Sequence, residues 1–369
     1  MAAVCHCFAA RQWLSARPEA AAILVGTSAV EVRSAGEGRG RGLFTTRPIP
    51  AFTGILSESP AILLRPTDDL PQLYEQYLAL REPGSDALHK KYMALSYHDL
   101  PQRDARLRAK LAERGFDHSG IEEMVRVASI MQNNAFNVDL GRGTGDSHRA
   151  LFPDVARVNH SCTPNAHVCF YQPENPDDRG RMVIHSLREL QADEEVLIAY
   201  FSILLPRTER QTKASKWGFR CQCPACEPRD AAHEEQRRAI TDFIAKQAAL
   251  MHDSRPTMKQ ITDLVAEGVK LIGKFDAYGQ LRPAIPDLYD NLAMLRAKGL
   301  LVQRKESQRG GVLEFLEQAT IYEAKLTGRD SPATKRRLHK LELFAAQKGA
   351  AGSAHLLTFE NNVYSVAWT

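Results

Sequence analysis

Apolar residues in the first part of the chain come in short runs that polar residues, glycine and proline interrupt. Such runs lie near residues 30–33, 43–46 and 55–58. Short runs of this kind favour strands, and glycine and proline mark the turns between them. The pattern predicts short strands up to about residue 64.

Helical spacing replaces this pattern between about residues 65 and 135. Apolar residues recur there every three or four positions, as in Leu73, Tyr77 and Leu80, and in Met124, Ala128 and Met131. That spacing places them on one face of a helix. The segment is therefore predicted to be a helical insertion between two groups of strands.

Strand texture returns after the insertion and continues to residue 200. Residues 167–171 and 181–185 predict a hairpin, and residues 196–200 predict a further strand after an acidic break at 193–195. The predicted order is strands, a helical insertion, strands again, and then a cluster of cysteines.

The last zone, residues 229–369, is predicted to form a helical C-terminal domain. Ile261, Leu264, Val265 and Ile272 form one apolar stripe, and Val312, Phe315, Leu316, Ala319 and Tyr322 form another. Stripes of this kind bury against neighbouring helices. The basic residues 335–337 are interpreted as a solvated helix face rather than a nucleic-acid patch.

Composition narrows the class of protein. A chain of 369 residues has room for roughly two domains. Its net charge of +4 permits an acidic partner but does not argue for one. No window approaches the roughly 18 apolar residues of a membrane span. The apolar run 20–26 is short and follows Arg17 and Glu19, so a strand or a helix end is expected there instead of a secretion signal.

Cysteine spacing points to a metal. Of seven cysteines, Cys221, Cys223 and Cys226 lie within six residues. Such clustering in a chain of this length fits a reducing compartment and a metal better than a disulfide scaffold. A structural zinc ion needs four ligands, so a remote fourth ligand is required. Cys162 is the preferred candidate, because it lies in a second conspicuous motif.

Other assignments of the cysteines stay open. Cys169 is the second choice, although its place in an apolar run suits a buried core thiol better. Cys5 and Cys7 could contribute from the N-terminal segment. Three free thiols on a loop are the remaining alternative, which the ready oxidation of clustered exposed thiols disfavours.

Glycines and a tyrosine add weaker signals. Gly40 and Gly42 alternate with arginines before a strand, where glycine allows close approach of the backbone or a positive φ. Taken alone, that pattern is explained better by a glycine-rich hairpin turn. Residues 141–145 are interpreted as a flexible loop. Tyr200 stands at the end of the strand predicted at 196–200.

In this order, the motifs resemble those of a SET-domain protein-lysine methyltransferase. They are Gly-Arg-Gly-Leu-Phe at 40–44, Asn-His-Ser-Cys-Thr-Pro-Asn at 159–165, the acidic stretch at 193–195 followed by Tyr200, and the three clustered cysteines. The subgroup that it resembles is the SET-and-MYND-like group with its fungal relatives. The resemblance covers about residues 28–227 and implies an α+β fold of small sheets with a helical insertion and a post-SET zinc cluster.

The resemblance implies S-adenosyl-L-methionine as the methyl donor and one structural zinc ion. It assigns cofactor binding to Arg39, Gly40, Arg41, Gly42, Asn159, His160 and Phe219. It assigns the walls of a lysine channel to Phe136 and Trp217. It makes Tyr200 the catalytic residue, and the implied metal ligands are Cys162, Cys221, Cys223 and Cys226.

The implied reaction is an in-line displacement on a methyl group bonded to a sulfonium. Because this displacement needs no metal, the zinc ion is expected to be structural. The protein contributes alignment and exclusion of water. Lysine must first lose a proton, and an apolar channel together with the sulfonium charge lowers its pKa from about 10.4. We expect the Tyr200 hydroxyl to orient the neutral amine rather than to act as a base.

Three departures from the family pattern and three hypotheses follow. Too few cysteines remain for a MYND module, and Trp217 stands where tyrosine or phenylalanine is usual; Lys213 replaces a common leucine. The leading hypothesis is a protein-lysine methyltransferase. The alternatives are a SET-fold protein with lost or altered chemistry, serving as a binding module or acting on a small molecule, and a zinc-stabilised nucleic-acid adaptor, which the mild charge disfavours.

The predicted organisation is an N-terminal segment at 1–27, a SET domain at 28–205 with its insertion at about 65–135, a post-SET segment at 206–228 and the helical domain at 229–369. The expected partner is a protein or peptide lysine substrate, histone or non-histone. We expect an intracellular monomer, in nucleus or cytoplasm, with no membrane partner and no strong nucleic-acid signal.

Overall fold

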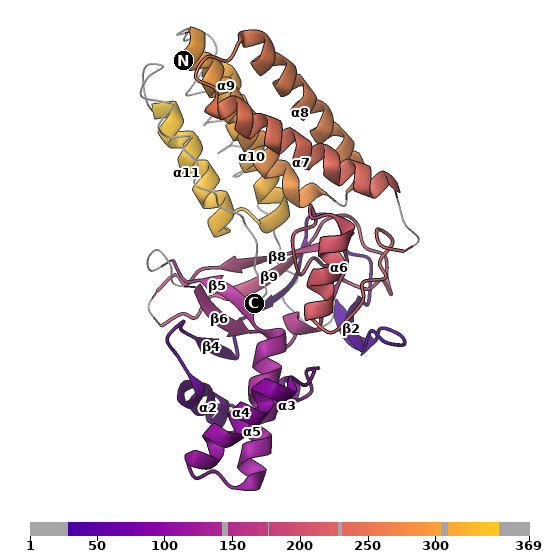
Figure 1. Cartoon of the computed structure of the whole chain (residues 1–369), viewed down its shortest axis with the longest axis vertical. Coiled ribbons are helices and arrows are strands. Elements are labelled where there is room, and N and C mark those ends of the chain that lie inside the picture. Colours follow the sequence, from indigo (N-terminus) through magenta and orange to yellow (C-terminus); the bar gives the residue numbers. More distant parts are fainter. Residues whose placement is uncertain are drawn as a thin grey trace.

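The computed structural model describes residues 29–141, 147–175, 177–227, 231–279, 281–303 and 309–346. The molecule is elongated, with the helices of the insertion at one end, small sheets in the middle and the C-terminal helices at the other end (Figure 1). The predicted α+β class, with small sheets, a helical insertion and a helical C-terminal region, is confirmed. The predicted N-terminal segment, Cys5 and Cys7, the apolar run 20–26 and most of the loop predicted at 141–145 lie outside the described residues.

In the described part of the chain, the strands form four small sheets. Their bounds are β1 Val30–Ser34, β2 Arg41–Thr45, β3 Gly54–Glu58, β4 Ile62–Leu64, β5 Phe136–Asp139, β6 Ser147–Leu151, β7 Asn159–His160, β8 Ala166–Tyr171, β9 Arg181–Ser186 and β10 Leu197–Ile198. Two sheets have the orders β3-β9-β8 and β4-β6-β5, and two are the pairs β1-β2 and β10-β7. Strands from before and after the insertion thus pair with each other, which closes the sheets around it.

The hairpin prediction is confirmed, because β8 and β9 pair antiparallel with His167 opposite His185. The predicted strand at 196–200 is wrong in length, since only β10 is strand and it pairs in parallel with β7. The hydrogen-bonding partner of this stretch changes from residue to residue. Val196 N bonds to Leu43 O, whereas Tyr200 N bonds to a histidine side chain.

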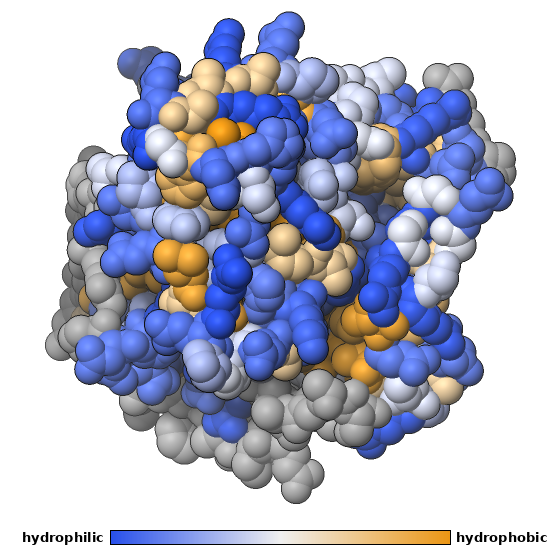
Figure 2. Space-filling model, turned by 90° about the horizontal axis from the view of Figure 1, so that it is seen from below, coloured by the Kyte–Doolittle hydropathy of each residue, from blue (hydrophilic) through white to orange (hydrophobic). Residues whose placement is uncertain are grey.

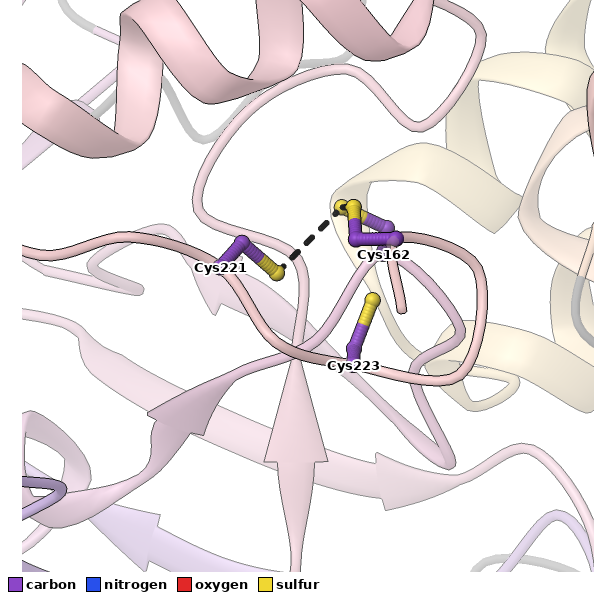
Figure 3. Close-up of side chains that lie close together, drawn as sticks. Cys162, Cys221 and Cys223 are labelled. Carbon is purple, nitrogen blue, oxygen red and sulfur yellow. Dashed lines mark hydrogen bonds between the residues drawn. The ribbon is translucent and has the colours of Figure 1, made fainter. Parts of the chain in front are cut away.

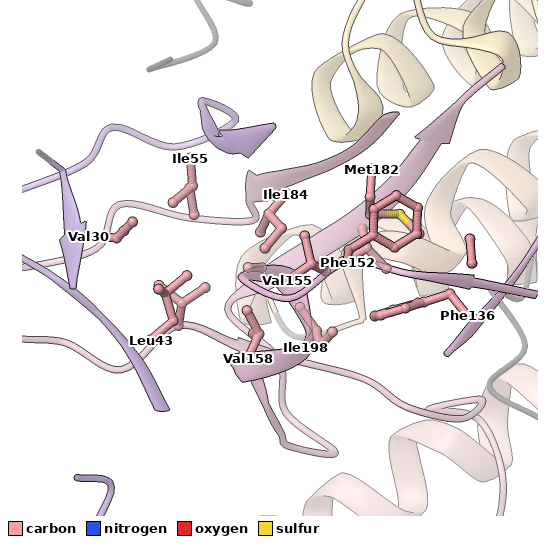
Figure 4. Packing of buried hydrophobic residues seen from close by; sticks show 14 of the residues in the cluster. Val30, Leu43, Ile55, Phe136, Phe152, Val155, Val158, Met182, Ile184 and Ile198 are labelled. Atoms are coloured by element: carbon pink, nitrogen blue, oxygen red, sulfur yellow. The ribbon is translucent and has the colours of Figure 1, made fainter. Parts of the chain in front are cut away.

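One hydrophobic core lies between the small sheets. Val30, Leu43, Ile55, Phe136, Phe152, Val155, Val158, Met182, Ile184 and Ile198 converge from seven elements and the segments between them (Figure 4). Burying such side chains contributes about 1.5–3 kcal/mol each. The elements are too short to be stable singly, so this shared core fixes their relative positions.

The insertion is helical and has its own core. Its helices are α2 Leu70–Ala79, α3 Asp86–Met93, α4 Pro101–Glu113 and α5 His118–Asn134. The Asp117 side chain accepts a hydrogen bond from Gly120 N and caps the start of α5. Tyr77 and Met124 from the predicted apolar faces are fully buried, as the spacing predicted.

Two short helices lie in the middle of the chain, η1 Val155–Arg157 and α6 Arg207–Lys216. The C-terminal region that follows them is built from long helices. The helices are α7 Ala231–His252, α8 Met258–Tyr278, α9 Ile285–Gln303, α10 Arg309–Thr327 and α11 Pro332–Ala346, with the short η2 Arg282–Ala284 before α9. Both predicted apolar stripes are buried on α8 and α10, apart from a half-buried Phe315.

The prediction of a solvated basic face at 335–337 is wrong for Arg337. Its side chain is 5% exposed and forms ion pairs with Asp287, Asp290 and Glu323. A buried guanidinium needs partners of opposite charge, and here three carboxylates from α9 and α10 supply them. The residue therefore joins three helices instead of facing solvent.

The C-terminal helices pack directly against the central sheets. The Tyr171 hydroxyl on β8 donates to Thr327 O at the end of α10, at 2.6 Å. Phe52, in the loop between β2 and β3, has a φ of 59° and contacts Tyr322 of α10 edge to face, with ring centroids 6.4 Å apart. A positive φ is costly for a bulky residue, so this contact holds the loop in place.

The face at the insertion end is mostly hydrophilic, and its apolar side chains gather in several separate groups (Figure 2). Leu78 and Tyr97 of the insertion are among the exposed large apolar residues of the chain, at 39% and 40%. Scattered exposure of this kind is normal and marks no particular docking site. None of the helices in the described ranges has the length and apolar character of a membrane span.

Candidate active site

The glycine-rich turn between β1 and β2 forms one edge of the candidate site. Gly36, Gly38 and Gly40 all have positive φ, and Ala35 N bonds to Gly40 O across the turn. At Gly42 the constraint is space. A Cβ atom there would lie 2.6 Å from Glu195 Oε1 and closer than ordinary contact to Asn159. Only glycine fits at this position without a shift of these two side chains.

Asn159 joins this turn to the strand that precedes Tyr200. Its amide donates to Glu195 Oε1 at 2.9 Å and lies 3.4 and 3.3 Å from the carbonyl oxygens of Arg39 and Arg41. Arg39 forms an ion pair with Glu195 at 2.5 Å. The structure thus brings together Arg39, Arg41, Gly42 and Asn159, which the sequence assigned to one site.

Tyr200 is half-buried and is linked to this group through Val158, the residue before Asn159. Its hydroxyl donates to Val158 O at 2.7 Å. Burial, and secondarily the charge of Glu195, raise the pKa of Tyr200 above its ordinary value. The hydroxyl is therefore protonated at neutral pH, which suits a hydrogen-bond donor rather than a base.

Two aromatic rings from the segment before the cysteine cluster lie beside Tyr200. The rings of Trp217 and Phe219 lie 5.7 and 6.2 Å from the Tyr200 ring, both in edge contact. Both side chains are half-buried. Phe136 is placed differently, because it is fully buried in the central core, where it meets Phe152 at 5.8 Å.

The His160 ring links Tyr200 to the cysteine cluster. Its Nδ1 accepts a hydrogen bond from Tyr200 N at 3.1 Å, so the ring proton is on Nε2, which lies 3.4 Å from Cys162 Sγ. Burial lowers the pKa of His160 to about 4, and the ring is neutral near pH 7. The ring also packs on Phe201, with centroids 4.3 Å apart. The sequence suggested contacts of His160 to a cofactor and did not indicate this side-chain role.

Cys162, Cys221, Cys223 and Cys226 come together in space. Their sulfur atoms all lie within 4.8 Å of one another. Figure 3 shows Cys162 facing Cys221 and Cys223 across the junction of the two segments. The Cys162 sulfur is 3.8 Å from that of Cys221 and 3.7 Å from that of Cys226.

This arrangement fits a zinc ion. A tetrahedron with zinc–sulfur bonds of about 2.3 Å has sulfur atoms about 3.8 Å apart, which matches both distances. The four thiols are free, and three of them are buried. Cys169, the second choice for the fourth ligand, is also buried but packs with Tyr171 and Val183, away from the cluster. It is the core thiol that its apolar run predicted.

Positive charge lies next to these sulfur atoms. Arg210 of α6 is completely buried, and its guanidinium is 4.0 Å from Cys226 Sγ and bonded to Glu234 of α7 at 2.6 Å. Arg237 of α7 is 2% exposed and donates to Cys162 O at 2.7 Å. A zinc ion with four thiolates carries a net charge of −2, which buried guanidinium groups favour.

Asn165, the last residue of the motif at 159–165, holds the turn against the sheets. Its side chain donates to Glu194 Oε1 and to Glu195 O, both at 2.9 Å, and accepts from Leu197 N at 2.7 Å. Its amide is thereby fully used within the protein, so the role of this residue is structural.

Sequence reasoning missed Glu195 as a member of the site. Its carboxylate binds both Arg39 and Asn159, whereas the acidic stretch was interpreted only as a break in the chain and as one motif of the family resemblance. Its position directly before an apolar strand was the available signal, since a carboxylate at a strand end adjoins the neighbouring loop. Nothing in the sequence pointed to Arg210 or Arg237, which lie in ordinary helical surroundings.

Residues 40–201 match the sequence profile of the SET domain family. Over 212 residues the chain is 25% identical to histone-lysine N-methyltransferase set5 of Schizosaccharomyces pombe, covering 57% of this chain and 53% of that protein. It is 43% identical over 77 residues to histone-lysine N-methyltransferase ATXR2 of Arabidopsis thaliana, covering 21% and 16%. It is 32% identical over 83 residues to human N-lysine methyltransferase SMYD2, covering 22% and 17%.

The chain thus spans about half or less of the length of these relatives. Among solved structures, the SET domain of LSMT bound to lysine and AdoHcy covers 96% of this chain, and 95% of that chain is covered, at 11% identity and a TM-score of 0.37. The similarity to SET-domain proteins thus rests on the family profile over residues 40–201 and on the sequence relatives.

Proposed function

We propose that this chain, which belongs to the SET-domain family through residues 40–201, is an S-adenosylmethionine-dependent methyltransferase acting on a protein lysine. The observation that carries the proposal is the position of Tyr200. Its protonated hydroxyl, an aromatic group and the glycine turn with Asn159 adjoin one another. Three relatives named above are histone-lysine or N-lysine methyltransferases, which supports a lysine substrate.

The cofactor site is proposed at the glycine turn. Arg39, Gly40 and Arg41 are exposed at the edge of the turn, and the space beside Gly40, where a Cβ atom would meet nothing within 4 Å, leaves room for the polar end of S-adenosylmethionine. Asn159 and the His160 backbone form the adjoining wall. Phe219 is the proposed surface for the adenine, because it is half-buried and has an apolar face near the Tyr200 ring.

The donor supplies the methyl group as a sulfonium when bound, and the protein orients the acceptor. Tyr200 and Trp217 are proposed to form the channel in which the lysine amine loses its charge, since apolar walls disfavour an ammonium. The Tyr200 hydroxyl positions the neutral amine and excludes water from it. We assign Phe136 to the inner end of the channel, supporting the wall from the core.

Zinc is proposed as a structural ion held by Cys162, Cys221, Cys223 and Cys226. The cluster closes with four sulfur ligands, which leaves no open position for a reacting group. The ion would fix residues 217–219 against the strand that carries Asn159 and His160.

The proposal is tested by titrating the purified full chain with S-adenosylmethionine and by labelling a cell extract with the radioactive donor. Wild-type protein should bind the donor and label protein bands that the Tyr200→Phe variant does not label. Binding without labelling would favour the second hypothesis, a SET-fold binding module. Absence of donor binding would refute the proposed function.

Gly42→Ala is expected to weaken donor binding about tenfold, a loss of roughly 1.4 kcal/mol. The added Cβ would displace Glu195 and Asn159, and so disturb the proposed amine site. Isothermal titration calorimetry measures the effect. The matched control is Gly273→Ala on α8, where a Cβ has open space; this variant should bind normally and be slightly more stable.

Trp217→Phe is expected to raise the number of methyl groups transferred to one lysine. The indole lies 5.7 Å from the Tyr200 ring, and a smaller ring leaves room for an already methylated amine to rotate. Mass spectrometry of the product measures the ratio of mono-, di- and trimethyl-lysine. An unchanged ratio would show that Trp217 does not limit the channel.

A further inference from the structure

Arg237 on α7 connects two segments of the site that are far apart in sequence. Its Nη2 donates to Cys162 O at 2.7 Å, and its Nε donates to Ile203 O at 2.5 Å. Cys162 follows His160, and Ile203 follows Tyr200. One buried guanidinium therefore holds both the motif at 159–165 and the segment that carries Tyr200. In Figure 1, α7 runs above α6 and the strands.

We infer that Arg237 is a positioning residue for the site, through which the C-terminal helices fix Tyr200 and Cys162 relative to each other. This inference rests on the proposed function in the previous subsection. Arg237 itself touches neither Tyr200 nor the proposed donor site. It acts through two backbone carbonyl groups, and each lies next to a segment whose side chains form the site.

The guanidinium group suits this task. It is planar, and its donors have fixed directions, so one side chain can serve two carbonyl groups at once. The side chain is 2% exposed, and such a donor left without its acceptor would be costly. Arg237 also approaches His233 O and the Glu234 carboxylate within its own helix, which holds the guanidinium in one orientation.

Apolar contacts also hold the segment that carries Tyr200. Ile203 is buried in the core of the C-terminal helices, and Ala199 and Leu204 pack against that core. Tyr200, between them, packs on the central core instead. The segment 199–204 thus packs partly on the central core and partly on the core of the C-terminal helices. The Arg237 bond to Ile203 O fixes the backbone of this segment between the two cores.

Glu234 joins a second arginine to the same arrangement. It bonds to Arg210, whose Nη1 donates to Leu205 O at 2.5 Å and whose Nη2 lies 4.0 Å from Cys226 Sγ. Residues 203 and 205 are therefore both held by guanidinium groups that contact Glu234. The same charges adjoin the sulfur cluster, so a shift of α7 would reach Tyr200 and the cysteines together.

The test uses the full chain with the substitution Arg237→Lys, because a single ammonium cannot serve both carbonyl groups in the same geometry. Three properties are measured: the dissociation constant for AdoHcy, the rate of zinc release to a chromogenic chelator, and the fluorescence of Trp217. Replacing Trp13 and Trp368 by phenylalanine leaves Trp217 as the single tryptophan. All measurements are made under conditions in which circular dichroism shows that the variant is folded.

The matched control is Arg309→Lys. Arg309 is also buried, 7% exposed, and bonds to a backbone carbonyl of Phe344 within the helical region. A positioning role predicts that Arg237→Lys weakens AdoHcy binding about tenfold, speeds zinc release about tenfold and shifts the Trp217 emission to longer wavelength. The control should lose stability without these three changes.

The measurements distinguish a failure of the positioning role of Arg237 from a failure of the proposed function. If the wild-type protein binds no AdoHcy, the proposed function fails, and zinc release and Trp217 emission still test Arg237. If those properties match the wild type, or if Arg309→Lys changes them equally, the positioning role is wrong. Should Arg237→Lys not fold, Arg237→Gln takes its place. Failure of both to fold, with a folded control, would make Arg237 a folding residue only.

Discussion

Tyr200→Phe is expected to lower the rate of methyl transfer about 100- to 1000-fold while the affinity for S-adenosylmethionine stays nearly unchanged. The substitution removes only the hydroxyl, which is proposed to orient the amine as the methyl group moves. The aromatic contacts of the ring to Trp217 and Phe219 need no hydroxyl. The effect should therefore appear in kcat rather than in donor binding.

A matched control separates this effect from stability. The Tyr92 hydroxyl donates to Val127 O at 2.8 Å, much as Tyr200 donates to Val158 O, but it lies buried in the insertion. Tyr92→Phe should cost a similar free energy of unfolding, about 1 kcal/mol, and leave the transfer rate intact. Equal activity of Tyr200→Phe and wild type would refute the proposed mechanism.

The pairing of β8 with β9 and the apolar face of α8 could be predicted because each depends on a local pattern. A period of two or of three to four residues determines which side chains are buried. The contact of Cys162 with the distant cysteines could be predicted for another reason. Three thiols need a fourth ligand, so chemistry supplied a long-range contact that periodicity cannot.

The failures have the opposite cause. The strand predicted at 196–200 shortens to β10 because its hydrogen-bonding partners change along its length. A run of apolar residues does not show which segments its backbone will pair with. Arg337 is buried because three carboxylates from two other helices meet it. The contact of Arg237 with Cys162 spans 75 positions. Charges are paired by tertiary structure, and a basic residue in a helix looks the same in sequence whether it is exposed or buried.

The same distinction applies to His160. The motif at 159–165 predicted that this residue belongs to the site, but not that its ring accepts from Tyr200 N and approaches Cys162 Sγ. These bonds make the ring a bridge between the proposed catalytic residue and the proposed metal ligands. Loss of the metal should consequently affect the site, and not only the stability of the fold.

Cys162→Ser is expected to lower the zinc affinity by more than about 100-fold, since even groups outside the ligand shell contribute about 10- to 100-fold. Wild-type protein should hold about one zinc ion per chain, and the variant should lose it on dialysis. The free energy of metal binding is also folding free energy, so thermal unfolding should occur at a clearly lower temperature. Inductively coupled plasma mass spectrometry and circular dichroism measure the two effects.

Cys169→Ser is the matched control, because Cys169 is also a buried thiol but packs away from the cluster. It should keep the zinc ion and lose only packing energy. Cys162→Ser leaves the Arg237 bond to Cys162 O in place, because that bond uses the backbone. Weakened donor binding in the zinc-free variant would therefore follow from the sulfur ligand itself, through His160 and residues 217–219. A Cys162→Ser protein that retains its full zinc content would show that the fourth ligand lies elsewhere.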